Sequence, residues 1–202
     1  LQLIAQLPMI SAYSYRAYRY YNTNDGSLVI HKPVAEYSTA QNVLHILRKD
    51  SSFTDLEAKV LDVCLILHAD HGGGNASTFT THLATSTGTD TYSAMAASLG
   101  SLKGPKHGGA NIKVMHMLEN IKENVKKRTE SNVYDYVRKI LAKKAFERTW
   151  IVYGIGHAVY TVSDPRAEVL KVYAGKLAEE KGLEEEFELY NTVAKAASEL
   201  IC

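Results

Sequence analysis

Three stretches of the sequence combine histidine with glycine in a way that is typical of binding sites. They read HADHGGGNAST at 68–78, GSLKGPKHGGAN at 100–111 and GIGHAVYTVSDPRA at 154–167. Ten of the thirteen glycines lie within 72–109 or at 154 and 156. Glycine lets the backbone approach a ligand closely or adopt a positive φ. We therefore expect these three loops to bring their histidines to one ligand.

The first stretch allows two kinds of site. His68 and His71 are three residues apart at the end of an apolar helical pattern, so with Asp70 they could share a face and bind zinc. The spacing, however, matches neither H-E-x-x-H nor H-x-x-E-H. The glycines and the Asn-Ala-Ser-Thr that follow favour a loop exposing backbone N–H groups at the start of a helix, which suits a carboxylate or phosphate. We favour an anion site with His71 as a donor, and predict no bound metal.

The second stretch places His107 in a Gly/Pro turn that leads directly into a helical pattern. The positive end of that helix would favour a neutral imidazole. A neutral histidine can donate an N–H to a developing enolate oxygen next to a carbonyl. The alternative is a histidine with only a structural role in a glycine turn.

The third stretch excludes one cofactor and suggests an acidic ligand. Gly154-x-Gly156 lacks the third glycine and the later acidic residue of a dinucleotide-binding turn. Arg166 occupies the second position of a helix that Asp164 would cap, so its guanidinium could hold a carboxylate with two hydrogen bonds. His157 precedes it by nine residues and could bind the same anion. Together the three stretches predict a pocket for a polycarboxylate.

The elements that must position these loops are predicted to be helices. Ser38-x-x-Gln41 and Thr54-x-x-Glu57 are capping boxes in front of amphipathic patterns. Helical periodicity also covers 110–127, 131–148, 165–181 and 184–201. A turn signal at 24–27, between Tyr20-Tyr21 and the apolar residues 28–30, predicts a small two-stranded element. Strands and helices do not alternate along the sequence, so the expected fold class is all-α.

Composition narrows the classes of partner. The 202 residues are 46% hydrophobic and carry 23 basic against 22 acidic side chains, which predicts no nucleic-acid partner. The apolar first fifteen residues are too short and interrupted to cross a membrane, and no secretory signal is recognisable. Cys64 and Cys202 make no disulfide framework, which favours a reducing compartment. Because the apolar patterns start without Met and stop abruptly, we expect a piece of a longer protein.

The three stretches, in this order and at these helical intervals, resemble the histidine motifs of the citrate synthase family. The similarity also covers 3–16, which resembles a helix well inside the large domain of that family. The resemblance implies a multi-helical fold in which 1–106 is part of the large domain and 107–202 is mostly the small domain, truncated at its C-terminal end. It implies an acyltransferase of the tricarboxylic acid cycle, cytoplasmic or in the mitochondrial matrix, and homodimeric at full length.

The resemblance also implies a role for each matching residue. His71, His157 and Arg166 would bind oxaloacetate, with His157 on its carbonyl. His107 would polarise the acetyl carbonyl of acetyl-CoA, a co-substrate, and no cofactor would be permanently bound. Ser77 would orient His107 through its hydroxyl. The last group of residues would meet the adenine end of coenzyme A: Tyr153, Gly154, Ile155 and Gly156.

The sequence departs from the family pattern in two places. Many members have an acidic residue where this chain has Gly72, which indicates a divergent branch. Nothing after Arg166 resembles the family's catalytic aspartate, so the 202 residues by themselves are predicted to be inactive. Two alternatives stay open: a 2-methylcitrate synthase, which uses propionyl-CoA, and a non-catalytic protein that binds a dicarboxylate or coenzyme A.

Overall fold

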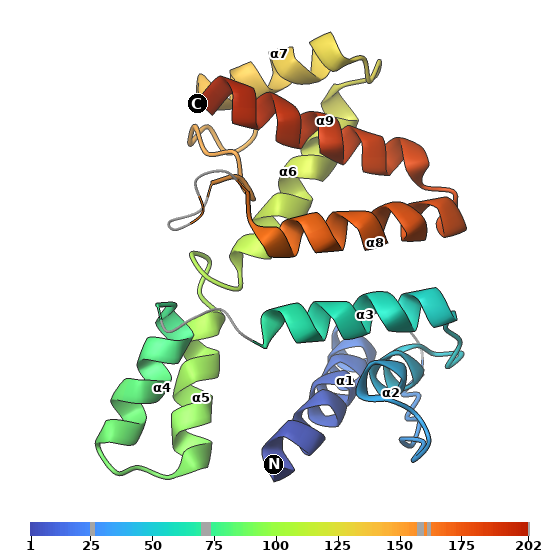
Figure 1. The fold of residues 1–202 in the computed structure, drawn as a ribbon, viewed down its shortest axis with the longest axis vertical. Helices are drawn as coiled ribbons and strands as arrows, with labels where there is room; N and C mark the ends of the chain where they lie inside the picture. Colours follow the sequence, from blue (N-terminus) through green and yellow to red (C-terminus); the bar gives the residue numbers. More distant parts are fainter. Residues whose placement is uncertain (25–26, 70–73, 157–159, 161–162, 202) are drawn as a thin grey trace. The chain divides into compact units, whose positions relative to one another are not determined.

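The computed structural model describes residues 1–24, 27–69, 74–156, 160 and 163–201, and within these ranges it contains helices and no strands (Figure 1). The helices are α1 (Gln2–Asn22), α2 (Thr39–Leu47), α3 (Asp55–His68), α4 (Ala76–Ser86), α5 (Thr91–Leu102), α6 (Ala110–Asn124), α7 (Glu130–Leu141), α8 (Pro165–Lys181) and α9 (Glu184–Ile201). The predicted all-α class is confirmed. None of the helices described is long and apolar enough to cross a membrane.

The chain divides into two compact units, each considered by itself. The first comprises Leu1–Asp70 and Val169–Leu177, and the second comprises His71–Glu168 and Ala178–Cys202. The predicted boundary between residues 106 and 107 concerns the domains of the whole family fold and stays a prediction.

In the first unit, α2 packs against both α1 and α3, and both predicted capping boxes are present. At α3, the Thr54 hydroxyl accepts from the Glu57 N–H at 3.2 Å, and Glu57 Oε2 accepts from the Thr54 N–H at 2.8 Å. Arg48 donates to both oxygens of the same buried Glu57 carboxylate, at 2.7 and 2.9 Å. Glu57, which completes the capping box, therefore also ties α3 to the end of α2.

The predicted two-stranded element is wrong for the residues described. Tyr20 and Tyr21 belong to α1, and residues 28–30 form no strand. Side chains of α1 supply partners for this segment, because the Tyr13 hydroxyl donates to the His31 carbonyl at 2.9 Å and Arg16 Nε donates to the Val29 carbonyl at 3.4 Å. The central turn residues, Asp25 and Gly26, lie outside the described residues.

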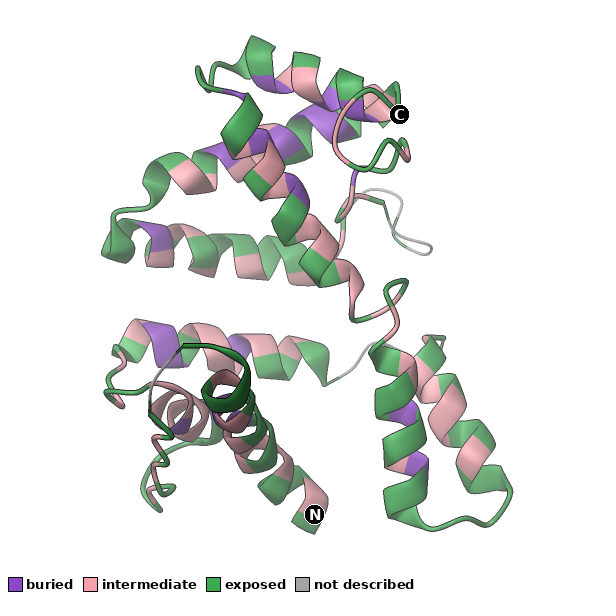
Figure 2. Ribbon diagram, turned by 180° about the vertical axis from the view of Figure 1, so that it is seen from behind, coloured by how far each residue is buried: buried purple, intermediate pink, exposed green. Residues whose placement is uncertain are grey.

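The core of the second unit lies where α6, α7 and α9 meet (Figure 2). Met117 and Ile121 contribute from α6, and α9 packs along α7. The other buried members of this core are Val125, Val133, Val137, Ile140, Val152, Leu189, Val193, Ala196 and Ala197. The α6 members of this core lie two to three turns after the start of the helix, which follows the turn containing His107.

Helix α7 is shorter than predicted. It ends at Leu141, whereas the periodicity indicated a helix to residue 148. Lys143, Phe146, Arg148 and Trp150 all have left-handed φ values, between 53° and 65°. Because a left-handed conformation costs a residue with a side chain about 1–2 kcal/mol, four of them in eight residues cannot continue a right-handed helix. Helix α6 likewise ends early, at Asn124, while α8 and α9 have the predicted bounds.

Helices α4 and α5 form an antiparallel hairpin within the second unit (Figure 1). Asn75 caps α4 by accepting from the Thr78 N–H, and Asp90 caps α5 through the N–H groups of Tyr92 and Ser93. The hydroxyls of Thr81 and Ser98 meet between the two helices at 2.6 Å. The hairpin brings the first turn of α4 near the end of α5, where the His107 turn begins.

Candidate active site

His107 and Ser77 are brought together across 30 residues of sequence. His107 Nε2 lies 3.0 Å from the Ser77 hydroxyl oxygen, and both side chains are half-buried. Ser77 stands in the first turn of α4, and His107 in the turn between α5 and α6. The contact agrees with the role that the resemblance implies for Ser77, namely to orient the imidazole.

The turn that carries His107 is closed by its own backbone. The His107 N–H donates to the Gly104 carbonyl at 3.0 Å, and the Gly108 N–H donates to the Leu102 carbonyl at 2.9 Å. A Cβ added at Gly108 would come within 2.6 Å of the Leu102 carbonyl oxygen, and one at Gly109 within 2.9 Å of the Gly104 carbonyl oxygen. The paired glycines are therefore required sterically, and they fix His107 immediately before α6.

The hydrogen of the Ser77 hydroxyl has two possible acceptors. The hydroxyl lies 2.7 Å from Asn75 Oδ1, to which it donates, and 3.0 Å from His107 Nε2. While Ser77 donates to Asn75, its oxygen accepts from the imidazole, so the hydrogen of a neutral His107 is on Nε2. If the hydroxyl turns toward His107 instead, Nε2 accepts and the opposite nitrogen, Nδ1, carries the hydrogen. Only this second arrangement lets a neutral His107 donate from Nδ1 to a ligand.

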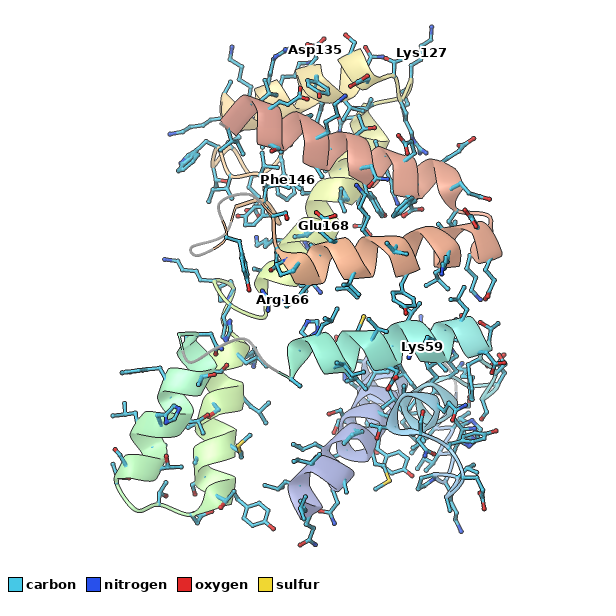
Figure 3. The ribbon with its side chains drawn as sticks, in the orientation of Figure 1. Lys59, Lys127, Asp135, Phe146, Arg166 and Glu168 are labelled. Carbon is cyan, nitrogen blue, oxygen red and sulfur yellow. The ribbon has the colours of Figure 1, made fainter. Side chains whose placement is uncertain are left out.

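Arg166 extends from the beginning of α8, as predicted, with Asp164 as the N-cap (Figure 3). The Asp164 carboxylate accepts from the Arg166 backbone N–H at 2.9 Å, from Nε at 3.0 and 3.2 Å, and from Nη2 at 2.6 Å. The guanidinium carbon also lies 5.9 Å from the centre of the Tyr160 ring. One carboxylate thus both caps α8 and orients the side chain that we expect to bind oxaloacetate.

The segment expected to meet coenzyme A turns tightly at its glycines. Gly154 and Gly156 have φ values of +85° and +88°, which side chains disfavour. A Cβ at Gly154 would lie 3.2 Å from a methyl group of Val114 in α6. The Tyr153 ring meets Phe146 edge-on, with 6.1 Å between ring centres. The backbone of this segment therefore lies directly against the second turn of α6.

Charged groups also hold this segment to α6. Glu147 accepts from Lys113 Nζ of α6 through Oε1 and from the Tyr153 hydroxyl through Oε2, the latter at 2.7 Å. The hydrogen bonds from Lys113 and then Tyr153 hold the pKa of Glu147 below its usual value. The same carboxylate raises the pKa of the Tyr153 hydroxyl and that of the Lys113 ammonium. Glu147 is therefore an ionised acceptor at neutral pH.

Two expected site residues, His71 and His157, lie outside the described residues. Of the possible zinc ligands in the first stretch, His68 donates from Nδ1 to the carbonyl of Cys64, one helical turn earlier, at 2.6 Å. Within the described ranges no group of three or more His, Cys, Asp or Glu side chains is arranged to hold a metal ion. Asp70 is outside those ranges, as is His71.

Three further residues, which were not predicted, are linked to the candidate site residues by hydrogen bonds. An asparagine directly before Ala-Ser-Thr is an N-cap signal, so Asn75 could have been found as a cap, although not as a partner of Ser77. Glu147 and Lys113 carried no signal, because the pair joins residues 34 apart and both lie in patterns that indicate solvated helix faces.

Comparisons with known proteins agree with this architecture. A family model described as citrate synthase, C-terminal domain, matches residues 1–201. A citrate synthase of Synechocystis is 40% identical over 170 residues, which is 84% of this chain and 40% of the relative. One of Deinococcus radiodurans is 37% identical over 194 residues, 96% of this chain and 46% of the relative. The crystal structure of citrate synthase from Pyrobaculum aerophilum superimposes with a TM-score of 0.74 at 28% identity, covering 96% of this chain and 43% of that one.

The described part of the chain is thus an all-helical protein in which a glycine turn holds a histidine directly in front of α6. The chain belongs to the citrate synthase family. It spans between 40% and 46% of the length of these two curated relatives.

Proposed function

We propose that this chain carries part of the active site of an enzyme that condenses acetyl-CoA with oxaloacetate. The observation that carries the proposal is the 3.0 Å contact between Ser77 and His107 in a glycine turn at the start of α6. Two loops with no sequence proximity meet there to orient one imidazole. Such an arrangement suits hydrogen bonding to a developing enolate oxygen.

The proposed reaction assigns each group one task. A base removes a methyl proton of the acetyl group while His107 donates a hydrogen bond to the thioester oxygen. The resulting enol carbon adds to the ketone carbon of oxaloacetate, which His71, His157 and Arg166 hold. Water then hydrolyses the thioester, releasing citrate and coenzyme A. Acetyl-CoA is a co-substrate, and the proposal includes no resident cofactor.

Oxaloacetate binding by the 202-residue chain tests the proposal. If the anion pocket is formed, oxaloacetate raises the melting temperature, and His71→Ala or Arg166→Ala abolishes the rise. Arg138→Ala is a matched control, because Arg138 also pairs with a nearby aspartate, Asp135 at 2.9 Å, but on the surface of α7. Absence of a shift in the unmodified chain would contradict a pocket formed by these residues.

Turnover by the chain alone is expected to be negligible. Enolisation needs a base within about 3 Å of the methyl proton, and nothing in 167–202 resembles the family's aspartate motif. Loss of a positioned base costs on the order of 10² to 10⁴ in rate. Release of free thiol from acetyl-CoA in the presence of oxaloacetate measures this, and rates typical of an enzyme would show that another group serves as base.

A second candidate substrate is propionyl-CoA. A 2-methylcitrate synthase of Shewanella oneidensis is 35% identical over 181 residues, which is 90% of this chain and 43% of the relative. One methylene in an acyl pocket changes selectivity by about 1–3 kcal/mol. Titration of the chain with acetyl-CoA and propionyl-CoA tests this, since tighter binding of propionyl-CoA favours the second candidate.

We also propose that the full-length protein assembles as a homodimer, in a cytoplasmic or mitochondrial-matrix setting. The α4–α5 hairpin supports association because several of its large apolar side chains are exposed, which is a common property of protein interfaces. They are Phe79, Leu83, Tyr92 and Leu99. Light scattering coupled to gel filtration would test it, and a monomer at micromolar concentration would count against association through this chain.

The alternative to an enzyme is a protein that binds oxaloacetate or coenzyme A without catalysing any condensation.

A further inference from the structure

Lys113, Glu147 and Tyr153 form a cluster that joins three separate parts of the second unit. Lys113 lies in the first turn of α6, Glu147 in the segment after α7, and Tyr153 at the start of the Tyr153–Gly156 segment. Each oxygen of the Glu147 carboxylate accepts from one of the other two side chains. All three side chains are partly exposed, so the cluster is accessible to solvent and close to the surface.

The backbone between Glu147 and Tyr153 cannot be held by regular helical hydrogen bonds. Left-handed φ values at Phe146, Arg148 and Trp150 interrupt any repeating pattern there. Apolar contacts fix this segment from one side, since Phe146 packs on the core and Val152 is buried within it. On the polar side, the Glu147 carboxylate links it to Lys113 of α6.

The residue after Lys113 also lies directly against the segment. Val114, next to Lys113, lies close to Gly154, where an added Cβ would come within 3.2 Å of it. Helix α6 begins three residues after His107. The cluster therefore joins Tyr153, through Glu147, to the first turn of the helix that follows the His107 turn.

We propose that Glu147 is a positioning residue for nucleotide binding: it holds the Tyr153–Gly156 backbone on α6 so that the adenine end of coenzyme A is bound in a fixed relation to His107. The inference rests on the proposed function and on the coenzyme A contact that the family resemblance implies for Tyr153–Gly156. Glu147 acts through the backbone it fixes and touches neither substrate. Because binding loses affinity when a ligand must also order the segment that receives it, removing Glu147 weakens coenzyme A binding.

The chain supplies a matched control of the same chemistry. Lys122, near the other end of α6, pairs with Glu186 of α9, which also accepts from the Tyr190 hydroxyl. The exposed fractions of the charged pairs are similar, 34% and 30% for Lys113 and Glu147 against 26% and 34% for Lys122 and Glu186. Glu186, however, stands in the first turn of α9, a regular helix, and not in the irregular segment after α7.

The experiment measures coenzyme A binding and the fluorescence of the segment in the 202-residue chain. Trp150 is the only tryptophan in the sequence, and 59% of its surface is exposed. Its quenching by acrylamide therefore reports on the segment between Glu147 and Tyr153 alone. Dissociation constants for coenzyme A and for oxaloacetate come from calorimetric titration of the same samples.

The expected result separates the two glutamates. Glu147→Gln raises the dissociation constant for coenzyme A about five- to tenfold, increases acrylamide quenching of Trp150, and leaves oxaloacetate binding unchanged. Glu186→Gln changes neither coenzyme A binding nor quenching. Combining Lys113→Glu with Glu147→Lys restores most of the affinity that Glu147→Lys alone loses, because the ion pair is re-formed in reverse.

The outcomes that overturn the inference differ from the failure of the proposed function. If the unmodified chain binds coenzyme A and Glu147→Gln binds it equally well, Glu147 has no positioning role although the proposed site stands. If Glu186→Gln weakens binding as much as Glu147→Gln, the effect is general destabilisation and the inference is wrong. If the unmodified chain does not bind coenzyme A, the proposed nucleotide site fails, and the inference that rests on it fails too.

Discussion

Helix α6 carries a Lys–Glu–Tyr cluster near each of its ends, and the two clusters hold very different structures. Near its start, Lys113 and Tyr153 share the carboxylate of Glu147, in an irregular segment with left-handed residues. Near its end, Lys122 and Tyr190 share the carboxylate of Glu186, in the first turn of α9. In both clusters, hydrogen bonds from the lysine and then the tyrosine keep the pKa of the glutamate below its usual value.

The difference lies in what would hold the backbone if the cluster were removed. Helix α9 has its own hydrogen bonds and buries Leu189 and Val193 in the core. The segment after α7 has few such restraints and lies beside the glycine loop that we expect to bind a ligand. We therefore expect the cluster near the end of α6 to contribute chiefly to stability. We expect the cluster near its start, which has the same three residue types, to contribute chiefly to local geometry.

The largest effect on stability is expected in the second half of α6, which contributes buried side chains to the core. Ile121 is fully buried in α6 between α7 and α9. Ile121→Ala removes buried methyl groups and leaves a cavity, so it should lower the free energy of unfolding by about 2–5 kcal/mol. Urea denaturation followed by circular dichroism measures the change. Ile112→Ala is the control on the same helix, because Ile112 is 60% exposed and should change stability by no more than about 0.5 kcal/mol.

A glycine substitution beside the start of α6 should affect ligand binding as well as stability. Gly154→Ala forces a side chain into a left-handed conformation, at a cost of about 1–2 kcal/mol, and brings it close to Val114. We expect it to weaken coenzyme A binding as well as to lower the melting temperature. Gly182→Ala has the same backbone strain at the end of α8, with nothing near the added Cβ. If both variants weaken binding equally, the close approach of Gly154 to α6 has no specific role.

Local signals in the sequence were enough to predict much of the fold. The capping boxes at Ser38 and Thr54, and the Asp164-Pro165 start of α8, depend on residues within three positions of each other, and all three are confirmed. The family resemblance implied that Ser77 orients His107; the two side chains do meet, and the orienting role stays a prediction. The local predictions succeed because each interaction is encoded by residues close together in the sequence.

The features that the sequence did not predict depend on backbone conformations and tertiary contacts that leave no local signal. Periodicity could not show that α7 ends at Leu141, because the left-handed turn after it includes Lys143 and Phe146, whose residue types do not indicate positive φ. The turn signal near Asn24 predicted strands, but α1 continues to Asn22 and its side chains bond the following segment. The pairing of Lys113 with Glu147 depends on the tertiary fold alone.

Acidification should weaken the two clusters together. A glutamate whose pKa is lowered in the folded state contributes stability that is complete above its unfolded pKa of about 4.3 and is lost as the pH falls through the folded value. Between about pH 5 and pH 3 the unmodified chain should therefore lose more stability than either Glu147→Gln or Glu186→Gln. Urea titrations at each pH measure the slopes. Parallel slopes in all three proteins would show that neither carboxylate stabilises the fold through its charge.

The smallest effect on stability is expected at Ser77, although this substitution should change the tautomer of His107, the imidazole that we propose acts in the reaction. Ser77→Ala removes one half-buried hydrogen bond and should lower stability by about 1 kcal/mol or less. In the unmodified chain the hydroxyl can satisfy either Asn75 or His107, so the imidazole hydrogen can move between Nε2 and Nδ1. Without the hydroxyl this control is lost, and the ¹⁵N chemical shifts of the His107 ring should report a changed ratio of the two tautomers. Thr81→Ala, which removes another hydroxyl from α4, should leave the His107 shifts unaltered. Unchanged ¹⁵N shifts in Ser77→Ala would mean that the serine only packs against the ring and does not control which nitrogen carries the hydrogen.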